Sequence, residues 1–394
     1  MLEGYVHPSF RDVAELFERQ LPTTVPGGGA LTVRHRGEVV VDLWGGQRAP
    51  GECWQQDTVA TSFSTSKGVA STLVHLLADR GLVDYRTPVA HYWPEFAQAD
   101  KGRISVRTLL AHEAGLYDVR DLLPSADVLT DWDKMLELLA AARPAHRPGS
   151  RHGYHAWTYG FLVGGLVERV TGKRLAEVLD EELVQPLGLD GAYFGLPEQE
   201  HGRAATLVLP KAREGEPSNG PWIPGLGVAK QVTNAAVRSQ TKELRRALVP
   251  HGIRDFDLNG AAFRSSCNPS AGGMFTARSL AGIYGMLAEG GLVDGHRYLS
   301  SHTLAKMGKR QSSTPDLVLR MPMHWRLGYH RIFSLTPRAP QAFGHFGWGG
   351  SGAWADPSRR LSLGFTCNSG TGSPVGDLRI MRLTTATLRA ADAR

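Results

Sequence analysis

The distribution of strand-like and helix-like patterns along the chain is the feature that most constrains its fold. Residues 1–85 and 260–394 mix both patterns, whereas residues 86–259 carry mainly helical periodicity. The length of 394 residues also exceeds the usual size of one compact core. The sequence therefore predicts an α/β domain, built from residues 1–85 and 260–394, that is interrupted by a helical insertion domain at 86–259.

The spacing of apolar side chains places individual elements within this plan. Two strand-like segments flank the turn at residues 35–38 and predict a β-hairpin. Apolar residues recur at helical spacing over 65–80, and Gly81 is typical of a helix end. Residues 210–227, rich in proline, glycine and charge, predict a long exposed loop. Further helices are expected at 9–21, 131–142, 156–171, 174–184, 276–290 and 376–391, and strands at 327–333, 351–356 and 360–368.

Composition argues against several classes of protein. The 44 basic and 38 acidic residues give a net charge of +6, but they are interspersed and no nucleic-acid-binding motif is present, so we expect no nucleic-acid partner. No apolar run approaches the roughly 20 residues of a membrane span, and the first residues do not have the pattern of a secretion signal. Cys53, Cys267 and Cys367 are widely spaced, which predicts buried free thiols in a cytoplasmic protein.

Several motifs of known chemistry are incomplete. Residues 347–352 match the glycine pattern of dinucleotide-binding proteins by letter, but no helix is expected after them. His112 and Glu113 lack the second histidine of a zinc-protease helix. His152 and His155 belong to a loop-like segment, where histidines are more often solvated than bound to metal. Catalysis must therefore come from other residues.

Two S-x-x-K tetrads occur, and their contexts differ. Ser239–Lys242 lies in a polar, charged stretch with little apolar surface. Ser64–Lys67 follows a strand-like segment and opens the apolar helix expected at 65–80. Positions i and i+3 share one face of a helix, so the Lys67 amine can reach the Ser64 hydroxyl.

The chemistry of nucleophilic catalysis explains why this pair is of interest. A serine hydroxyl becomes a good nucleophile when a base takes its proton, and a lysine can be that base only when its charged form is disfavoured. Partial burial and the positive helix end both favour a neutral Lys67. The chain has nine lysines against 35 arginines, and arginine is too basic for this role. The tetrad alone leaves open a capping serine beside a surface lysine.

Two further segments complete a recognisable pattern: residues 148–156, which contain Tyr154, and residues 344–351, which contain His345. With the tetrad, they make the sequence resemble the serine β-lactamase-like superfamily of penicillin-binding proteins, class C β-lactamases and, most closely, family VIII carboxylesterases. Supporting segments follow in the family's order at 108–116, 167–175, 185–195 and 268–291. The resemblance implies an α+β fold, an α/β sandwich in which an antiparallel sheet is flanked by helices and carries an inserted, mainly helical domain.

By position, the resemblance assigns roles to three residues. Ser64 matches the acyl-accepting nucleophile, and Lys67 is its partner in the tetrad. Tyr154 matches the tyrosine whose phenol oxygen exchanges protons with the serine and the leaving group. Which of Lys67 and Tyr154 is the primary base stays open.

The resemblance also locates a substrate-binding strand. His345–Gly347 matches the family's K-T-G box in the H-x-G form of esterase-like members, so the backbone N–H groups of Ser64 and Trp348 are expected to form the oxyanion hole. An alternative register makes Trp348–Gly350 the box. The residues expected to bind the oxyanion or the substrate are Trp348, His345, Gly347 and His155.

Two departures from the family bear on the substrate. Ala156 stands where β-lactamases commonly carry asparagine, and His345 replaces the box lysine. Both missing groups help to hold the amide and carboxylate of penicillins and cephalosporins. The aromatic residues expected either to line an apolar pocket or to pack in the core are Tyr117, Trp157, Phe346 and Trp348.

The sequence thus predicts a serine carboxylesterase that acts on short- to medium-chain, small-molecule esters through an acyl-enzyme on Ser64, without a metal or an organic cofactor. An acyltransferase with the same acyl-enzyme, a weak β-lactamase and a catalytically silent binding protein are the alternatives. The oligomeric state is left open.

Overall fold

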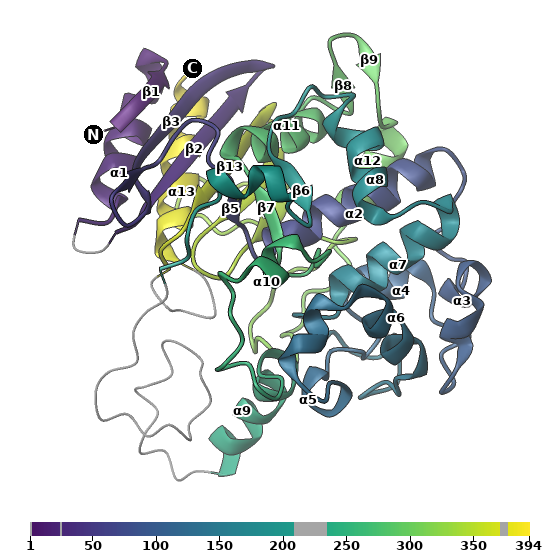
Figure 1. Cartoon of the computed structure of the whole chain (residues 1–394). Coiled ribbons are helices and arrows are strands. Elements are labelled where there is room, and N and C mark those ends of the chain that lie inside the picture. Colours follow the sequence, from purple (N-terminus) through teal and green to yellow (C-terminus); the bar gives the residue numbers. More distant parts are fainter. Residues whose placement is uncertain (1, 24–25, 209–234, 371–376) are drawn as a thin grey trace.

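The two ends of the chain meet in one antiparallel sheet (Figure 1). The computed structural model describes residues 2–23, 26–208, 235–370 and 377–394, and the loop expected at 210–227 lies outside them. Within these residues the sheet has eight strands in the order β1-β3-β2-β13-β12-β11-β10, with β4 paired to β3. The strands are β1 (Leu2–Val6), β2 (Gly28–His35), β3 (Glu38–Ala49), β4 (Glu52–Cys53), β10 (His330–Arg331), β11 (Phe343–Phe346), β12 (Gly352–Asp356) and β13 (Leu361–Cys367).

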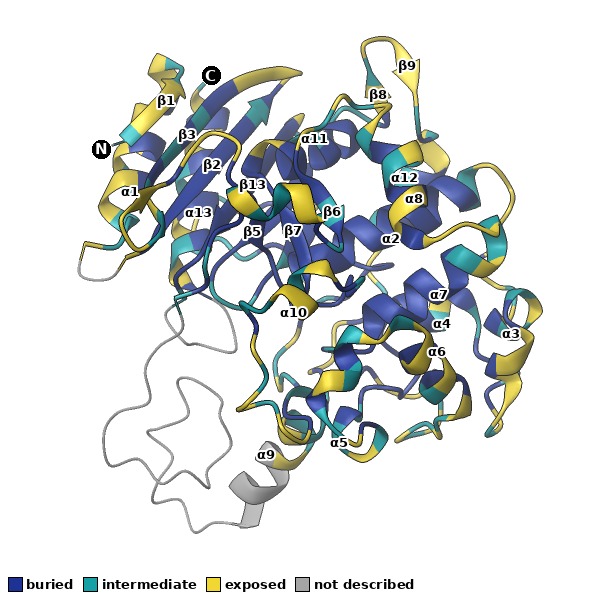
Figure 2. Cartoon of the chain, viewed as in Figure 1, coloured by how far each residue is buried: buried dark blue, intermediate teal, exposed yellow. Residues whose placement is uncertain are grey.

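The pairing of this sheet confirms the predicted antiparallel arrangement. Strands β2 and β3 form the expected hairpin around the turn at residues 35–38. Strand β13, near the C-terminus, pairs with β2, so residues more than 300 positions apart lie side by side in the middle of the sheet. Every residue of β12 and β13 is buried, which fits a sheet covered on both faces (Figure 2).

Helices cover both faces of the sheet. Helices α1 (Arg11–Gln20) and α13 (Leu378–Ala393) pack together on one face, and α11 (Ala277–Ala288) packs on the other (Figure 1). The alternation along β12 matches this arrangement, because Trp354 joins the core with α1 and α13 whereas Ala353 and Ala355 join the core with α11. The helices predicted near both chain ends are therefore confirmed as the outer layers of the sandwich.

The middle of the chain is mainly helical, as predicted. Helix α2 (Thr65–Asp79) is buried along most of its length and packs against both β11 and α7, so it joins the sheet to this helical region. The remaining α-helices are α3 (Val89–Tyr92), α4 (Val106–Leu110), α5 (Val119–Leu122), α6 (Trp132–Ala141), α7 (Tyr159–Thr171), α8 (Leu175–Leu179), α9 (Ala235–Leu248), α10 (Ala261–Ser265) and α12 (Ser301–Gly308). A π-helical turn spans Asp180–Val184, and 3₁₀ turns span Pro8–Phe10, Pro94–Ala97, Ala126–Thr130 and Glu198–Arg203.

Short strands account for the differences from the sequence-based elements. Strand β6 (Ala192–Phe194) lies in the middle segment and pairs with β7 (Gly273–Phe275), which also pairs with β5 (Ala60–Thr61). A strand of three residues is too short to show a period of two, so hydrophobic periodicity does not predict it. The strand expected at 327–333 shortens to β10, and a further hairpin joins β8 (Leu292–Val293) to β9 (His296–Arg297). The domain boundaries at 85/86 and 259/260 stay a prediction.

The cysteines depart from the expectation of three buried thiols. All three are unpaired, but Cys53 is exposed, Cys267 is half-buried and only Cys367 is buried. Cys53 is exposed because it lies on the two-residue strand β4 at the margin of the sheet. Among the described residues, none of the helices has the length and apolar character needed to cross a membrane.

Substitution of two glycines that lie within helices tests how tightly the layers pack. A Cβ at Gly160 in α7 would overlap the backbone of Pro269 and Ser270, whereas a Cβ at Gly282 in α11 would meet only the end of the Leu189 side chain, at 2.7 Å. We expect Gly160→Ala to lower the free energy of unfolding by about 1–3 kcal/mol, because backbone cannot move aside as a side chain can.

Urea denaturation measures this difference. Gly282→Ala is the matched control, and we expect it to change stability by less than about 1 kcal/mol, since better helix propensity offsets the contact. Equal losses in the two variants would contradict the close backbone packing at Gly160.

Candidate active site

Ser64 lies at the N-terminus of α2, directly after a turn with unusual backbone geometry. Phe63 has a φ of +44°, a conformation that is costly for a residue with a Cβ. Its carbonyl accepts hydrogen bonds from the Ser66 backbone N–H and hydroxyl, and its ring packs edge-on against Trp348 with centroids 5.0 Å apart. The Ser64 hydroxyl makes no capping bond to α2. The turn instead directs it toward two other side chains.

The first of these side chains is Lys67, one helical turn along α2. Its Nζ lies 2.9 Å from Ser64 Oγ and donates a hydrogen bond of 2.7 Å to the Ser270 carbonyl. The side chain is fully buried, and no carboxylate of the described residues forms an ion pair with it. Burial therefore lowers the pKa of Lys67 well below its usual 10.5. A neutral amine beside the serine can accept the hydroxyl proton.

The second is Tyr154, from the loop before α7. Its O–H donates a hydrogen bond of 2.6 Å to Ser64 Oγ, and the Lys67 Nζ lies 5.1 Å from the centre of its ring. Burial raises the pKa of Tyr154, so the phenol is protonated. The serine oxygen thus lies between an amine whose charged form is disfavoured and a phenol, and these two groups can accept and supply protons in turn.

His345 and Gly347 lie at the end of β11, the strand against which α2 packs. A Cβ at Gly347 would overlap the Ser62 carbonyl, so only glycine allows the strand end to approach the turn before Ser64. His345 is buried, its Nδ1 lies 3.1 Å from the Phe346 carbonyl, and its ring lies 6.2 Å from that of Tyr154. Burial lowers the pKa of His345 well below its usual 6.5, so this ring is neutral.

The alternative register of the box lies beyond the strand. Trp348–Gly350 belongs to the turn between β11 and β12, where Gly349 and Gly350 have φ values of +88° and +110°. His345–Gly347, by contrast, includes the last two residues of β11. The geometry of a box on a strand that edges the site therefore favours His345–Gly347.

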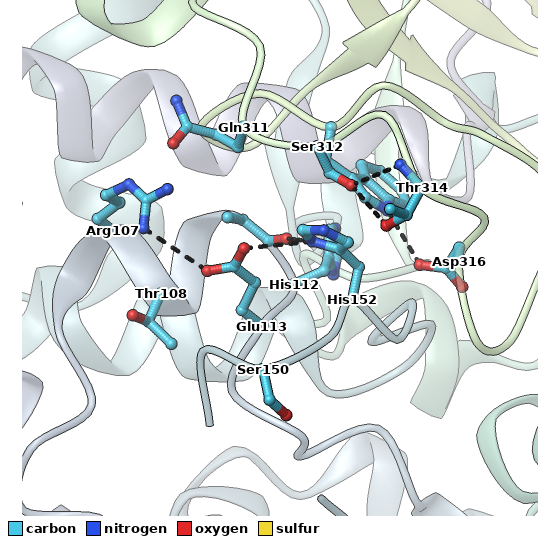
Figure 3. A network of polar contacts seen from close by, with 12 residues as sticks. Arg107, Thr108, His112, Glu113, Ser150, His152, Gln311, Ser312, Thr314 and Asp316 are labelled. Atoms are coloured by element: carbon cyan, nitrogen blue, oxygen red, sulfur yellow. Dashed lines mark hydrogen bonds and ion pairs between the residues drawn. The ribbon is translucent and has the colours of Figure 1, made fainter. Parts of the chain in front are cut away.

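His155 and His152 are not the solvated loop residues that the sequence indicated. His155 is buried, and its Nε2 accepts a hydrogen bond of 2.9 Å from the Leu116 N–H. Burial lowers its pKa to about 3, which suits a permanent acceptor. His152 Nδ1 lies 3.5 Å from a carboxylate oxygen of Glu113, which also faces Arg107 (Figure 3). His155 is not among the described residues that line the cavity beside Ser64.

A cavity of about 310 Å³ opens beside the serine. Ser64, Tyr154, His345, Gly347 and Trp348 line it, and the rest of its wall is mostly apolar. No lysine or arginine is among the described lining residues, and Asp377, the acidic one, pairs with Arg379 at 2.7 Å. The apolar lining residues are Phe63, Ala156, Trp157, Leu248, Ile253, Leu258, Ala271, Leu319, Met321, Met323, Trp325, Phe333, Phe346, Leu378, Ile380 and Met381.

The aromatic residues singled out from the sequence divide between the two expected roles. Trp157, Phe346 and Trp348 line the cavity. Tyr117 does not, because its ring packs in the core and its hydroxyl donates a hydrogen bond of 2.7 Å to Glu243.

The second tetrad has a different setting. It lies on α9, where Lys242 is exposed to solvent. Lys67, by contrast, is fully buried and lies beside Ser64. The structure therefore separates the two tetrads as the sequence context indicated.

A protein-family model described as Beta-lactamase matches residues 14–386. The chain belongs to this family. It is 36% identical over 374 residues to the esterase/beta-lactamase LipL of Mycobacterium tuberculosis, a match that covers 93% of this chain and 82% of that protein. The predicted family is therefore confirmed, and with it a serine hydrolase.

Solved structures give the same result for the fold of this beta-lactamase-family chain. A family VIII carboxylesterase superposes with a TM-score of 0.86 at 34% identity, covering 99% of this chain and all of that one. A penicillin-binding protein homologue from Caulobacter crescentus superposes with a TM-score of 0.83 at 33% identity, again over 99% of this chain. The predicted β-lactamase/transpeptidase-like α+β fold is confirmed.

Sequence reasoning missed several residues of the beta-lactamase-family site. Ser270, whose carbonyl contacts Lys67, lies in a segment that supported the resemblance but received no role of its own. Trp325 and Asp316, which contact Tyr154, lie in an irregular segment without periodicity. Phe63 carries no sequence signal for its positive φ.

A second buried lysine allows the function of Lys67 to be separated from its contribution to stability. We expect Lys67→Met to lower kcat/KM for an ester by about 100- to 10,000-fold, because the proton acceptor is lost. Stability should stay equal or rise, because an apolar side chain replaces a desolvated amine that has no carboxylate partner.

Lys101→Met is the matched control. Lys101 is also buried, but its Nζ donates to three carbonyls, those of Gln98, Ala140 and Ala142, at 2.7, 2.8 and 2.6 Å. Its loss should cost about 1–3 kcal/mol of stability and leave kcat/KM unchanged. Steady-state kinetics and urea denaturation of both variants measure the contrast, and full activity of Lys67→Met would contradict a role as base.

Proposed function

We propose that the protein is a serine carboxylesterase that hydrolyses neutral, small-molecule esters through an acyl-enzyme on Ser64. The observation that carries this proposal is the contact of one serine oxygen with both the buried Lys67 amine, at 2.9 Å, and the Tyr154 hydroxyl, at 2.6 Å. This serine lines an apolar cavity, where an ester carbonyl has access to it.

In the first step, Ser64 Oγ attacks the ester carbonyl carbon while its proton passes to the neutral Lys67 amine. The carbonyl oxygen becomes an oxyanion, which the backbone N–H groups of Ser64 and Trp348 stabilise. The carbon–oxygen bond to the alcohol then breaks as Tyr154 donates its proton to the leaving oxygen. The Lys67 ammonium returns a proton to Tyr154, and both groups are neutral again.

In the second step, water attacks the carbonyl carbon of the acyl-enzyme. Its proton passes to the neutral Lys67 amine, directly or through Tyr154, and a second oxyanion forms in the same place. The bond between the acyl carbon and Ser64 Oγ then breaks, and Ser64 regains a proton from the pair. The products are the free acid and the original enzyme.

The lining of the cavity favours esters over penicillins and cephalosporins. These β-lactams carry a carboxylate, and neither His345, which is neutral, nor any other described lining residue offers it a cation. A volume of about 310 Å³ is at the small end for a ligand site, which fits short- to medium-chain acyl groups. The names of LipL and of the family VIII carboxylesterase also include ester hydrolysis.

Hydrolysis of β-lactams is the second candidate, because LipL is named as both an esterase and a β-lactamase. Acyl transfer to an alcohol uses the same acyl-enzyme and differs only in the acceptor, so product analysis with added alcohol distinguishes it. A location in the cytoplasm stays a prediction from the unpaired cysteines.

Mass spectrometry of the protein with p-nitrophenyl butyrate and with nitrocefin tests the nucleophile and the substrate class together. We expect a butyryl adduct on Ser64, rapid release of p-nitrophenol, and nitrocefin turnover at least about 100-fold slower, since a buried or unpaired carboxylate is costly.

Ser64→Ala should abolish adduct and turnover, whereas Ser239→Ala, in the second tetrad, should keep both. An adduct on another residue, or full activity of Ser64→Ala, would overturn the proposal. Faster turnover of nitrocefin than of the ester would replace the esterase with a β-lactamase.

A further inference from the structure

A buried carboxylate lies behind Tyr154, outside the groups that contact the substrate cavity. Asp316 is only 1% exposed, and no cationic side chain of the described residues forms an ion pair with it. Its Oδ1 accepts hydrogen bonds from the backbone N–H groups of Tyr154, Val318 and Leu319, at 3.2, 2.8 and 3.0 Å. Its Oδ2 accepts one from Trp325 Nε1, at 2.9 Å. The carboxylate is therefore solvated by four N–H donors instead of water.

The Trp325 ring connects this carboxylate to the Tyr154 side chain. It lies parallel to the Tyr154 ring, with centroids 5.5 Å apart and planes 13° apart. His112 packs against the Trp325 ring with a centroid separation of 4.3 Å. One carboxylate thus holds both the backbone of Tyr154 and the ring on which its phenol is stacked.

We propose that Asp316 is a positioning residue for Tyr154: through the Tyr154 N–H and the Trp325 ring it fixes the phenol oxygen on Ser64 Oγ, and it places a negative charge next to this residue. This inference rests on the proposed function, since it concerns the group that protonates the leaving alcohol. Burial of a carboxylate costs free energy of folding even when the group is hydrogen-bonded. An uncharged side chain would therefore serve a purely structural role here at a lower cost.

The electrostatic part follows from the groups around Tyr154. Besides Asp316, the titratable groups that face its ring are Lys67 from α2, His345 from β11, His112 from the turn after α4 and Tyr159 from α7. Burial lowers the pKa values of the lysine and both histidines and raises that of Tyr159, so burial disfavours a charge on each of these neighbours.

The carboxylate adds a negative charge to this neutral surrounding. The Asp316 charge raises the pKa of Tyr154, in the same direction as burial. Removal of that charge therefore lowers the pKa of Tyr154, and the proton of the phenol is lost at lower pH.

Asp316→Asn tests both parts of the proposal. We expect kcat for p-nitrophenyl butyrate to fall by about 10- to 100-fold, as for a misplaced catalytic group, while KM changes little. The rate should fall at high pH as Tyr154 loses its proton, and in the variant this fall should begin at lower pH. Trp325→Phe keeps the stacked ring but removes its N–H donor, so it should lower kcat with a smaller shift of the profile.

Asp356→Asn is the matched control. Asp356 is 0% exposed and accepts a hydrogen bond from the Ser358 N–H at 3.0 Å, but it is the last residue of β12 and is not among the described residues that line the cavity. Asp356→Asn should lower the free energy of unfolding without a change in the pH–rate profile. Fold is checked by circular dichroism, and Ser64 acylation is followed by mass spectrometry.

An unmoved pH profile in Asp316→Asn, or an equal shift in Asp356→Asn, would overturn the proposal. If Asp316→Asn does not fold, an unchanged kcat in Trp325→Phe overturns it instead. The wild type distinguishes this failure from that of the proposed function: when the wild type forms no acyl adduct on Ser64, the esterase proposal itself is wrong.

Discussion

The desolvation of the Lys67 amine is the interaction on which the rest of the site depends. In water, or beside a carboxylate, the amine would be charged and unable to accept the serine proton. Here it is fully buried, and its hydrogen-bond partners among the described residues are the Ser64 hydroxyl and the Ser270 carbonyl. Burial of the lysine lowers the stability of the folded protein, and the same burial makes the amine useful as a base.

The fold supplies this burial by placing α2 between its two halves. The helix packs against β11, next to the edge strand β10 of the eight-stranded sheet, and also against α7 of the helical region. The Ser270 turn packs on Gly160 at the start of α7, where the glycine N–H donates to Ser270 Oγ at 2.6 Å. Residues more than 100 positions apart thus fix the acceptor that orients the amine. The reactive groups are held by the close packing of layers rather than by a flexible loop.

The elements and contacts that the sequence predicts well are those that depend on local patterns. The β2–β3 hairpin, α2 and the reach from Ser64 to Lys67 depend on periodicity and on spacing within one element. Tyr154 was located by its family segment and meets Ser64 across 90 residues of sequence. The parts that were missed depend on distant neighbours: the burial of His155, the three-residue β6, and the contacts of Asp316 with Tyr154 and Trp325. Their residue types are common in loops, and only the tertiary packing gives them a role.

The pKa of Lys67 is the most direct test of how this site works. The chain has nine lysines, so NMR titration of protein labelled with [ε-¹³C]lysine gives few resonances, and that of Lys67 is assigned by its disappearance in Lys67→Arg. We expect it to titrate well below the usual 10.5 of a lysine side chain. A Lys67 resonance that titrates at or above 10.5 would contradict a neutral base at the serine.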